Sequence, residues 1–259
     1  MNVYSLFSQN ALRNFNYVIP YSQNNAVLID PSSQSYVARF LDQNWLHPTI
    51  IINTHHHFDH TQGNEFFVSN YNCKLYIPAD SSIWGEDAWL EDNDIINLDE
   101  WTYLKVYYTP GHTYDHISLG LYEDNEFKAL FTGDSFFNAW IGNCYAWDPE
   151  VAYNTVKNFY FHLPDNVKIY PGHDYMETNL KFDLSIEPNN QKANNLLSKL
   201  ENTNPWEIVT DMETEKLINP FLRINEESVI NGIINKFNLS YTPGEKEVFL
   251  KLRELRNKW

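Results

Sequence analysis

The segment "THHHFDH", residues 54–60, gathers four of the nine histidines of this 259-residue chain and an aspartate. It follows directly after the apolar run "TIII" at residues 49–52. Imidazoles and carboxylates without cysteine suit zinc, iron or manganese at a catalytic rather than a structural site. Alternate residues of an extended segment point the same way, so His55 and His57 can bind one ion. The segment therefore predicts a metal site.

Three further residues of metal-binding type follow apolar runs later in the chain. His112 follows "VYYTPG", Asp134 follows "ALFTG" and His173 follows "KIYPG". Loops at strand ends are where sheet proteins assemble their sites. Neighbouring strands would thus bring together seven candidate ligands: His55, His57, Asp59, His60, His112, Asp134 and His173. Seven ligands exceed the needs of one ion and fit two, joined by a carboxylate and a water molecule that the ions activate for attack on a carbonyl group.

The other histidines are expected to have different roles. His56 lies between two candidate ligands and should point away from the metals. We expect His47, His116 and His162 at the surface or behind the ligands.

The elements that must position these residues can be read from the hydrophobic pattern. Residues 1–178 alternate turns with short apolar runs rich in β-branched and aromatic residues, which predict strands. These runs cover 26–31, 49–54, 74–80, 104–113, 116–122, 128–135 and 167–174. Helices are predicted at 33–45 and 148–163, the second with Asp148 as N-cap and Pro149 in its first turn. The pattern predicts an α/β fold with helices packed on a mixed sheet.

The hydrophobic pattern of the sequence changes from residue 179 onward. Helical spacing dominates there, over 190–202, 228–238 and 244–259. We therefore expect two domains, a catalytic domain at 1–178 and a helical substrate-binding domain at 179–259.

Composition excludes several classes of partner. The formal net charge of −16 falls almost entirely in residues 1–178, and an acidic surface repels nucleic acid. No apolar run approaches the roughly 20 residues of a membrane span, and the N-terminus does not read as a signal peptide. Only two cysteines occur, which suits a reducing compartment. We expect a cytoplasmic monomer that contacts neither membrane nor nucleic acid and acts on a small molecule.

The motifs resemble those of a known superfamily. "THHHFDH" is similar to the T-H-x-H-x-D-H signature of the metallo-β-lactamases, and "TPGHT", "FTGDS" and "YPGHDY" are similar to its later motifs in the same order. Within it, "LFTGDSFF", "IEPNN" and "NPFLR" resemble glyoxalase II, the hydroxyacylglutathione hydrolases. The resemblance implies an αβ/βα sandwich with a dinuclear site at one sheet edge, and a C-terminal helical domain that carries part of the thiol-cofactor site.

The resemblance also implies a role for each candidate ligand. Metal one falls on His55, His57 and His112, metal two on Asp59, His60 and His173, and Asp134 bridges them. Asp59 and Asp134 are then the catalytic carboxylates. Two divalent ions are expected, with zinc as the first choice and iron or manganese as alternatives.

Four substrate contacts follow from the same resemblance, at Asn143, Tyr145, Tyr175 and Arg223. Asn143 stands where the subfamily commonly has a lysine. Asn225, Glu226 and Glu227 occupy the stretch where a second basic residue usually follows the arginine. Both missing cations would face glutathione carboxylates, so a less anionic thiol is an alternative to glutathione.

The activity implied is hydrolysis of the thioester S-lactoylglutathione to D-lactate and glutathione, the methylglyoxal-detoxifying step of the glyoxalase pathway. A thiolate with a pKa of about 8.5–9 can leave without a strong general acid. The alternatives are hydrolysis of another acyl-thiol ester or a lactone, persulfide oxygenation with one iron, and a non-catalytic binding module. A substrate panel, metal content and oxygen consumption distinguish them.

Overall fold

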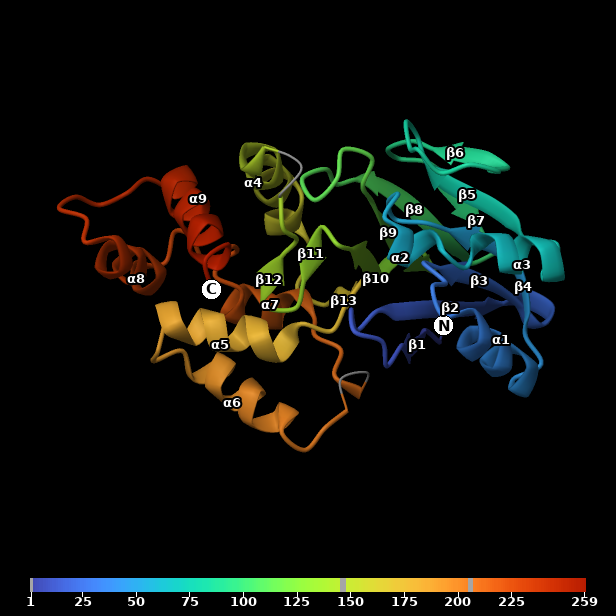
Figure 1. The fold of residues 1–259 in the computed structure, drawn as a ribbon, viewed down its shortest axis with the longest axis horizontal. Coiled ribbons are helices and arrows are strands. Elements are labelled where there is room, and N and C mark those ends of the chain that lie inside the picture. Colours follow the sequence, from blue (N-terminus) through green and yellow to red (C-terminus); the bar gives the residue numbers. More distant parts are fainter. Residues whose placement is uncertain (1, 145–147, 205–206) are drawn as a thin grey trace.

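Two β-sheets face each other in this chain, with helices on their outer sides and a helical region towards the C-terminus (Figure 1). The computed structural model describes residues 2–144, 148–204 and 207–259. The first sheet is antiparallel from β1 to β3 and parallel from β3 to β6. Its strands, in spatial order, are β1 Tyr4–Phe7, β2 Phe15–Tyr21, β3 Asn25–Ile29, β4 His47–Ile52, β5 Lys74–Pro78 and β6 Ala88–Leu90.

The second sheet has the order β13-β10-β9-β8-β7, and only the β13–β10 pair is parallel. Its strands are β7 Ile95–Asn97, β8 Thr102–Tyr108, β9 Ile117–Glu123, β10 Glu126–Gly133 and β13 Lys168–Pro171. A separate antiparallel pair is formed by β11 Phe136–Phe137 and β12 Trp140–Ile141.

The helices of the N-terminal part are α1 Gln34–Gln43, α2 Phe58–Thr61, α3 Asn64–Tyr71 and α4 Pro149–Asn158. Those of the C-terminal half are α5 Met176–Ile186, α6 Gln191–Leu200, α7 Met212–Ile218, α8 Glu227–Phe237 and α9 Glu245–Arg256. Short 3-10 turns occupy Ser22–Asn24 and Tyr160–His162.

Apolar side chains from both sheets fill the space between them. Ile29 and Ile52 of the first sheet share one buried cluster with Leu119 and Phe131 of the second. On the outer face of the first sheet, a second cluster joins Leu28 to residues of α1 and α3. The alternation of inward and outward residues along the strands thus supplies both faces of the sheet. The predicted αβ/βα sandwich is confirmed.

The C-terminal helices pack against the outer side of the second sheet. One buried cluster joins Leu130 of β10 to Tyr153 of α4 and Phe249 of α9. Glu215 of α7 is fully buried, and its Oε2 accepts a hydrogen bond from the backbone N–H of Ala139 at 2.8 Å. The predicted domain boundary at residue 178 falls within α5 and stays a proposal.

Most predicted elements are present with shifted ends. The helix predicted at 148–163 is α4 followed by a 3-10 turn, and Asp148 caps it by accepting from the N–H of Glu150 at 2.9 Å. The strands β1, β2, β6, β7, β11 and β12 lie outside the predicted runs. Their runs are short or interrupted by polar residues, so the hydrophobic period is weak there.

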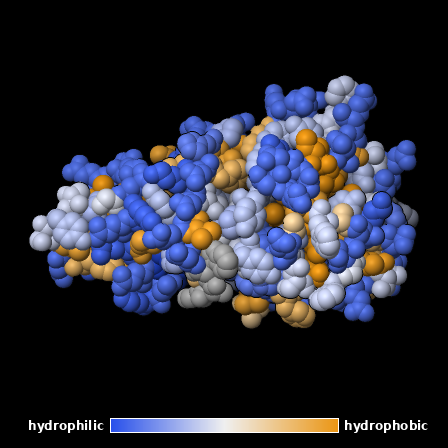
Figure 2. All heavy atoms as spheres, turned by 90° about the horizontal axis from the view of Figure 1, so that it is seen from above, coloured by the Kyte–Doolittle hydropathy of each residue, from blue (hydrophilic) through white to orange (hydrophobic). Residues whose placement is uncertain are grey.

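Hydrophilic residues make up most of the molecular face seen from above, with hydrophobic residues in small groups (Figure 2). Among the described residues, none of the helices is both long enough and apolar enough to cross a membrane. Cys73 and Cys144 are buried and form no disulfide.

Candidate metal centre

The seven predicted ligands come from four strand ends that meet at one edge of the sandwich. The segment after β4 carries His55 and His57 and then turns into α2, which carries Asp59 and His60. The loop after β8 carries His112, and the ends of β10 and β13 lead to Asp134 and His173. The parallel pairing of β10 with β13 places the last two loops next to each other. The predicted convergence of strand ends is present.

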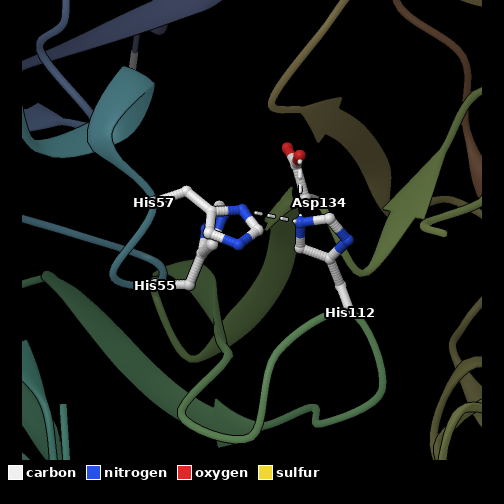
Figure 3. A group of neighbouring side chains, drawn as sticks. All are labelled: His55, His57, His112 and Asp134. Carbon is white, nitrogen blue, oxygen red and sulfur yellow. Dashed lines mark hydrogen bonds and ion pairs between the residues drawn. The ribbon is translucent and has the colours of Figure 1, made fainter. Parts of the chain in front are cut away.

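Four of the side chains form a first group: His55, His57, His112 and Asp134. Their candidate ligand atoms all lie within 4.8 Å of one another. Nδ1 of His57 lies 3.0 Å from Nε2 of His112, and the side chains approach each other from two sides (Figure 3). The geometry of this group can hold one metal ion.

Asp59, His60 and His173 form a second group. Nε2 of His60 lies 3.2 Å from Nε2 of His173, and Oδ2 of Asp59 lies 3.4 Å from the same His173 nitrogen. The two histidines are buried, whereas the side chain of Asp59 is 22% exposed. One side of this group is therefore open to a small molecule.

Asp134 lies between the two groups. Its Oδ1 is 3.3 Å from Nε2 of His60, and its Oδ2 is 3.4 Å from Nε2 of His112 and 3.3 Å from Nε2 of His173. A carboxylate can offer one oxygen to each of two ions. Asp134 therefore has the position that a bridging ligand requires.

The two groups contain buried polar atoms whose unsatisfied lone pairs a bound cation would accept. Nε2 of His55 and Oδ1 of Asp134 are buried without a hydrogen-bond partner among the described residues. Buried polar atoms rarely stay unpaired in folded proteins. The nitrogen-to-nitrogen approach of His60 to His173 brings ring atoms together that repel if both present lone pairs. A cation between them removes that repulsion, and the His/Asp donor set suits zinc, iron or manganese.

Burial favours the neutral imidazoles that metal binding requires in the first group. It lowers the pKa of His55, His57 and His112, so these imidazoles are neutral near pH 7 and keep a lone pair. In the second group burial also acts to lower the pKa of His60 and His173, but Asp134 outweighs it and raises the pKa of both. Burial opposes ionisation of Asp134, but the adjacent His173 and His60 outweigh it and hold its pKa well below the usual range.

Comparisons with known proteins agree with this geometry. The sequence model of the metallo-β-lactamase superfamily matches residues 13–184, and that of the hydroxyacylglutathione hydrolase C-terminus matches residues 174–259. A protein of Nitrosococcus oceani named hydroxyacylglutathione hydrolase is 40% identical, with 100% of both chains covered. The chain belongs to the hydroxyacylglutathione hydrolase family of the metallo-β-lactamase superfamily.

Two further comparisons show the breadth of this family and fold. A Polaromonas protein also named hydroxyacylglutathione hydrolase is 38% identical, again with 100% of both chains covered. The crystal structure of ETHE1 from Myxococcus xanthus has a TM-score of 0.66 at 24% identity, covering 99% of this chain and 98% of that chain. The likeness to the Myxococcus xanthus structure concerns the fold alone.

In this family member, buried polar residues fix the orientation of several candidate ligands. Oδ2 of Asp30 accepts from Nδ1 of His60 at 2.9 Å, and the same carboxylate accepts from the N–H and hydroxyl of Thr54. Nε2 of His116 accepts from the backbone N–H of Asp134 at 3.0 Å. Such outer contacts fix the tautomer and direction of metal ligands. Sequence reasoning missed Asp30, although it lies in the predicted strand at 26–31, one residue before its end.

The remaining histidines have three different environments. Nδ1 of His56 lies 2.8 Å from Oδ1 of the buried Asp115, and His56 is in neither ligand group. His116 is fully buried behind His55, with the two rings stacked at 5.1 Å. His47 and His162 are exposed.

The predicted substrate contacts lie in different parts of the molecule. Tyr175 stacks on His173, with ring centroids 5.0 Å apart and planes 4° from parallel, and burial raises its pKa to about 12. The backbone oxygen of Asn143 accepts from Nδ1 of His112 at 2.9 Å. Tyr145 lies outside the described residues. Arg223 makes a two-point ion pair with Glu187, at 2.9 and 2.8 Å, so its guanidinium is already engaged.

The described residues place another cation beside the segment that precedes Tyr145. Arg253 of α9 is buried, and its Nη1 donates to the backbone oxygen of Gly142 at 3.0 Å. A Cβ on Gly142 would lie 3.2 Å from Cβ of His112, so this backbone is next to the metal centre. Sequence reasoning missed Arg253 because a basic residue in a helix is usually a solvated one.

Proposed function

We propose that the chain hydrolyses the thioester S-lactoylglutathione to D-lactate and glutathione with two divalent metal ions. The observation that carries the proposal is the position of Asp134 between two ligand groups, in a chain whose full-length relatives are named hydroxyacylglutathione hydrolase. The proposed ligands are His55, His57 and His112 for metal one, Asp59, His60 and His173 for metal two, and Asp134 for both.

The donor set supports zinc as the first choice, with iron and manganese as alternatives, because imidazole and carboxylate ligands accept all three. When bound, the two ions supply Lewis-acid activation of water and of the thioester carbonyl. Neutral His55, His57 and His112 and the ionised Asp134 are already in the protonation states that metal binding needs.

The chain's own residues would then position the reactants. Asp59 is the ligand-group carboxylate that is partly open to solvent, so it can accept a hydrogen bond from the attacking water and orient it. Tyr175 stays protonated at neutral pH, so its hydroxyl can donate to the bound thioester. The leaving thiol has a pKa of about 8.5, so it can depart as a thiolate without a strong general acid.

The thiol half of the substrate is proposed to lie along the segment that contains Gly142 and Asn143, and Tyr145 and Tyr175 are proposed as further contacts. Of the two arginines, Arg253 is next to this segment and donates to the neutral groups of Gly142 and Asn257, whereas the charge of Arg223 is paired with that of Glu187. We therefore propose Arg253 as the main cation for the thiol carrier's carboxylates and Arg223 as a weaker contact. These cations make glutathione the favoured thiol despite Asn143.

We also propose a cytoplasmic monomer that binds neither nucleic acid nor membrane. The acidic charge of −16 and the two unpaired buried thiols support this proposal. Light scattering on a size-exclusion column tests the monomer, and fractionation of cells tests the location.

A substrate panel tests the function directly. The purified, metal-analysed protein is assayed with S-lactoylglutathione, other acyl-glutathione esters, acyl esters of uncharged thiols and simple lactones. We expect the highest kcat/KM for S-lactoylglutathione, with no oxygen consumed on a persulfide. A higher kcat/KM for a lactone or for oxygen-dependent turnover would overturn the proposal.

A further inference from the structure

The loop between β1 and β2, residues 8–14, lies against the second ligand group. Nδ2 of Asn14 donates to Oδ2 of Asp59 at 3.0 Å, with a longer contact of 3.3 Å to the backbone oxygen of Asp59. Asn14 is only 1% exposed, so water does not compete for this hydrogen bond. The loop therefore holds the one ligand-group carboxylate that is partly open to solvent.

A neighbouring amide fixes the direction of the Asn14 side chain. Nδ2 of Asn10 donates to Oδ1 of Asn14 at 2.8 Å, and Oδ1 of Asn10 accepts from the backbone N–H of Asn14 at 3.2 Å. An ionised carboxylate only accepts hydrogen bonds, so the NH₂ end of Asn14 must face Asp59. The chain of donors runs from Asn10 through Asn14 to Asp59.

The same loop also orients His173. The backbone oxygen of Leu12 accepts from Nδ1 of His173 at 2.7 Å. This bond places the ring proton on Nδ1 and leaves the lone pair of Nε2 directed at the ligand group. The N–H of Phe15 donates to the oxygen of Gly172 at 2.8 Å, which ties the start of β2 to the residue before His173.

The loop at residues 8–14 contacts the second ligand group and not the first. Among the described residues, the hydrogen bonds of residues 8–14 reach Asp59 and His173 of the second group, and none reaches His55, His57 or His112 of the first. The first group has separate contacts, such as the backbone oxygen of Asn143 on His112. Within the described part of the chain, the loop at residues 8–14 therefore supports the second group directly and the first group not at all.

We propose that Asn14 is a positioning residue that sets the affinity of the second metal site without affecting the first. The inference rests on the proposed dinuclear centre. Loss of an outer hydrogen bond to a metal ligand lowers metal affinity by about 10- to 100-fold. Removal of the Asn14 donor therefore weakens the second equivalent of metal by that factor and leaves the first unchanged.

Calorimetric titration of the metal-free full chain with Zn²⁺ tests the inference, and Co²⁺ absorption provides a second readout that does not depend on activity. Asn14→Leu keeps the size of the side chain and removes the donor. Asn179→Leu is the matched control, because Asn179 is also buried but donates to the backbone oxygen of Asn138 instead of to a ligand. Asn10→Ala alters an exposed residue, so it keeps the test usable should Asn14→Leu fold poorly.

In the unmodified chain we expect two equivalents. Asn14→Leu should bind the second equivalent about 10- to 100-fold more weakly, Asn10→Ala should show a smaller change in the same direction, and Asn179→Leu should match the unmodified chain. If Asn14→Leu binds both equivalents more weakly by the same factor, the role of Asn14 is overturned while the dinuclear centre stands. The same holds if neither Asn14→Leu nor Asn10→Ala weakens metal binding. A single equivalent in the unmodified chain overturns the dinuclear centre and this inference with it.

Discussion

A Cβ atom added to Gly172 would lie 2.3 Å from Oδ1 of Asp134. It would also lie 2.9 Å from Cε1 of His60. The backbone of Gly172 therefore passes so close to the candidate bridging carboxylate that a methyl group has no room. The glycine of "YPGHDY" thus leaves room for the metal centre.

Gly172→Ala should displace Asp134 and lower kcat/KM. A misplacement of about 1 Å can cost a factor of about 100, and we expect a loss of that order. Gly244→Ala is the control, because no atom lies within 4 Å of a Cβ at that position. Metal analysis should give fewer than two metal equivalents per chain for Gly172→Ala. It should give two for Gly244→Ala. Full metal content and activity in Gly172→Ala would contradict the close approach.

Asp134→Ala should remove most activity, because both ligand groups lose a shared carboxylate. The loss should exceed the roughly 100-fold effect of removing an outer contact. His56→Ala should lower activity less than tenfold, since His56 contacts Asp115 and lies in neither ligand group. It should instead lower the free energy of unfolding by about 1–3 kcal/mol, because the buried Asp115 loses its partner. Similar kinetics in the two variants would contradict the prediction that His56 points away from the metals while His55 and His57 face them.

The cations of the C-terminal half should act on binding more than on chemistry. A charge-assisted hydrogen bond contributes about 1.5–3 kcal/mol, so Arg253→Gln should raise KM for S-lactoylglutathione about 10- to 100-fold with a smaller change in kcat. Asn143→Lys should lower KM. Steady-state kinetics of both variants provide the check, and an unchanged KM in both would place the thiol carrier elsewhere.

Arg223→Gln should mainly lower stability. Its ion pair with Glu187 is largely buried, and breaking such a pair costs about 3–5 kcal/mol because one charge is stranded. Thermal unfolding should therefore show a lower Tm, whereas KM should rise less than in Arg253→Gln. A larger KM effect at Arg223 with an unchanged Tm would assign the main substrate contact to Arg223.

Asp183 of α5 should make the stability of the protein depend on pH. Both of its carboxylate oxygens are buried without a hydrogen-bond partner among the described residues, and burial together with Glu187 raises its pKa to about 8. The unfolded chain loses this proton near pH 4, so it binds fewer protons than the folded chain between about pH 4 and pH 8. The free energy of unfolding therefore falls as pH rises through that window and levels off above it.

Asp183→Asn removes this titration. At pH 8 the free energy of unfolding of the variant should exceed that of the unmodified chain by at least about 1 kcal/mol, which corresponds to about 2–4 °C in Tm. This difference should vanish near pH 4. Asp42→Asn on the exposed side of α1 is the control and should show no such trend. A gain that is equal at both pH values would assign the effect to packing instead of to ionisation.

The candidate ligands could be predicted from sequence because residue type and local spacing determine them. His55 and His57 alternate along an extended segment, and Asp134 and His173 each follow an apolar run directly. Alternation and strand ends are local properties of the chain, so no knowledge of the tertiary fold was needed to list these residues.

The supporting residues could not be predicted, because their contacts join segments that are far apart in sequence. Asn14 reaches Asp59 over 45 residues, and Arg253 reaches Gly142 over 111. Asn14 also lies in a loop with no distinctive pattern. The engagement of Arg223 by Glu187 likewise follows from how α5 packs near α8, which the motif "NPFLR" does not reveal.

We propose that two metal ions, bridged by Asp134, drive thioester hydrolysis. The most direct test measures the rate of thiol release from S-lactoylglutathione while the metal-free chain is titrated with Zn²⁺. We predict that the rate is negligible without metal, rises with added Zn²⁺ and reaches its plateau at two equivalents per chain. A plateau at one equivalent, or no thiol release at any loading, would contradict the account.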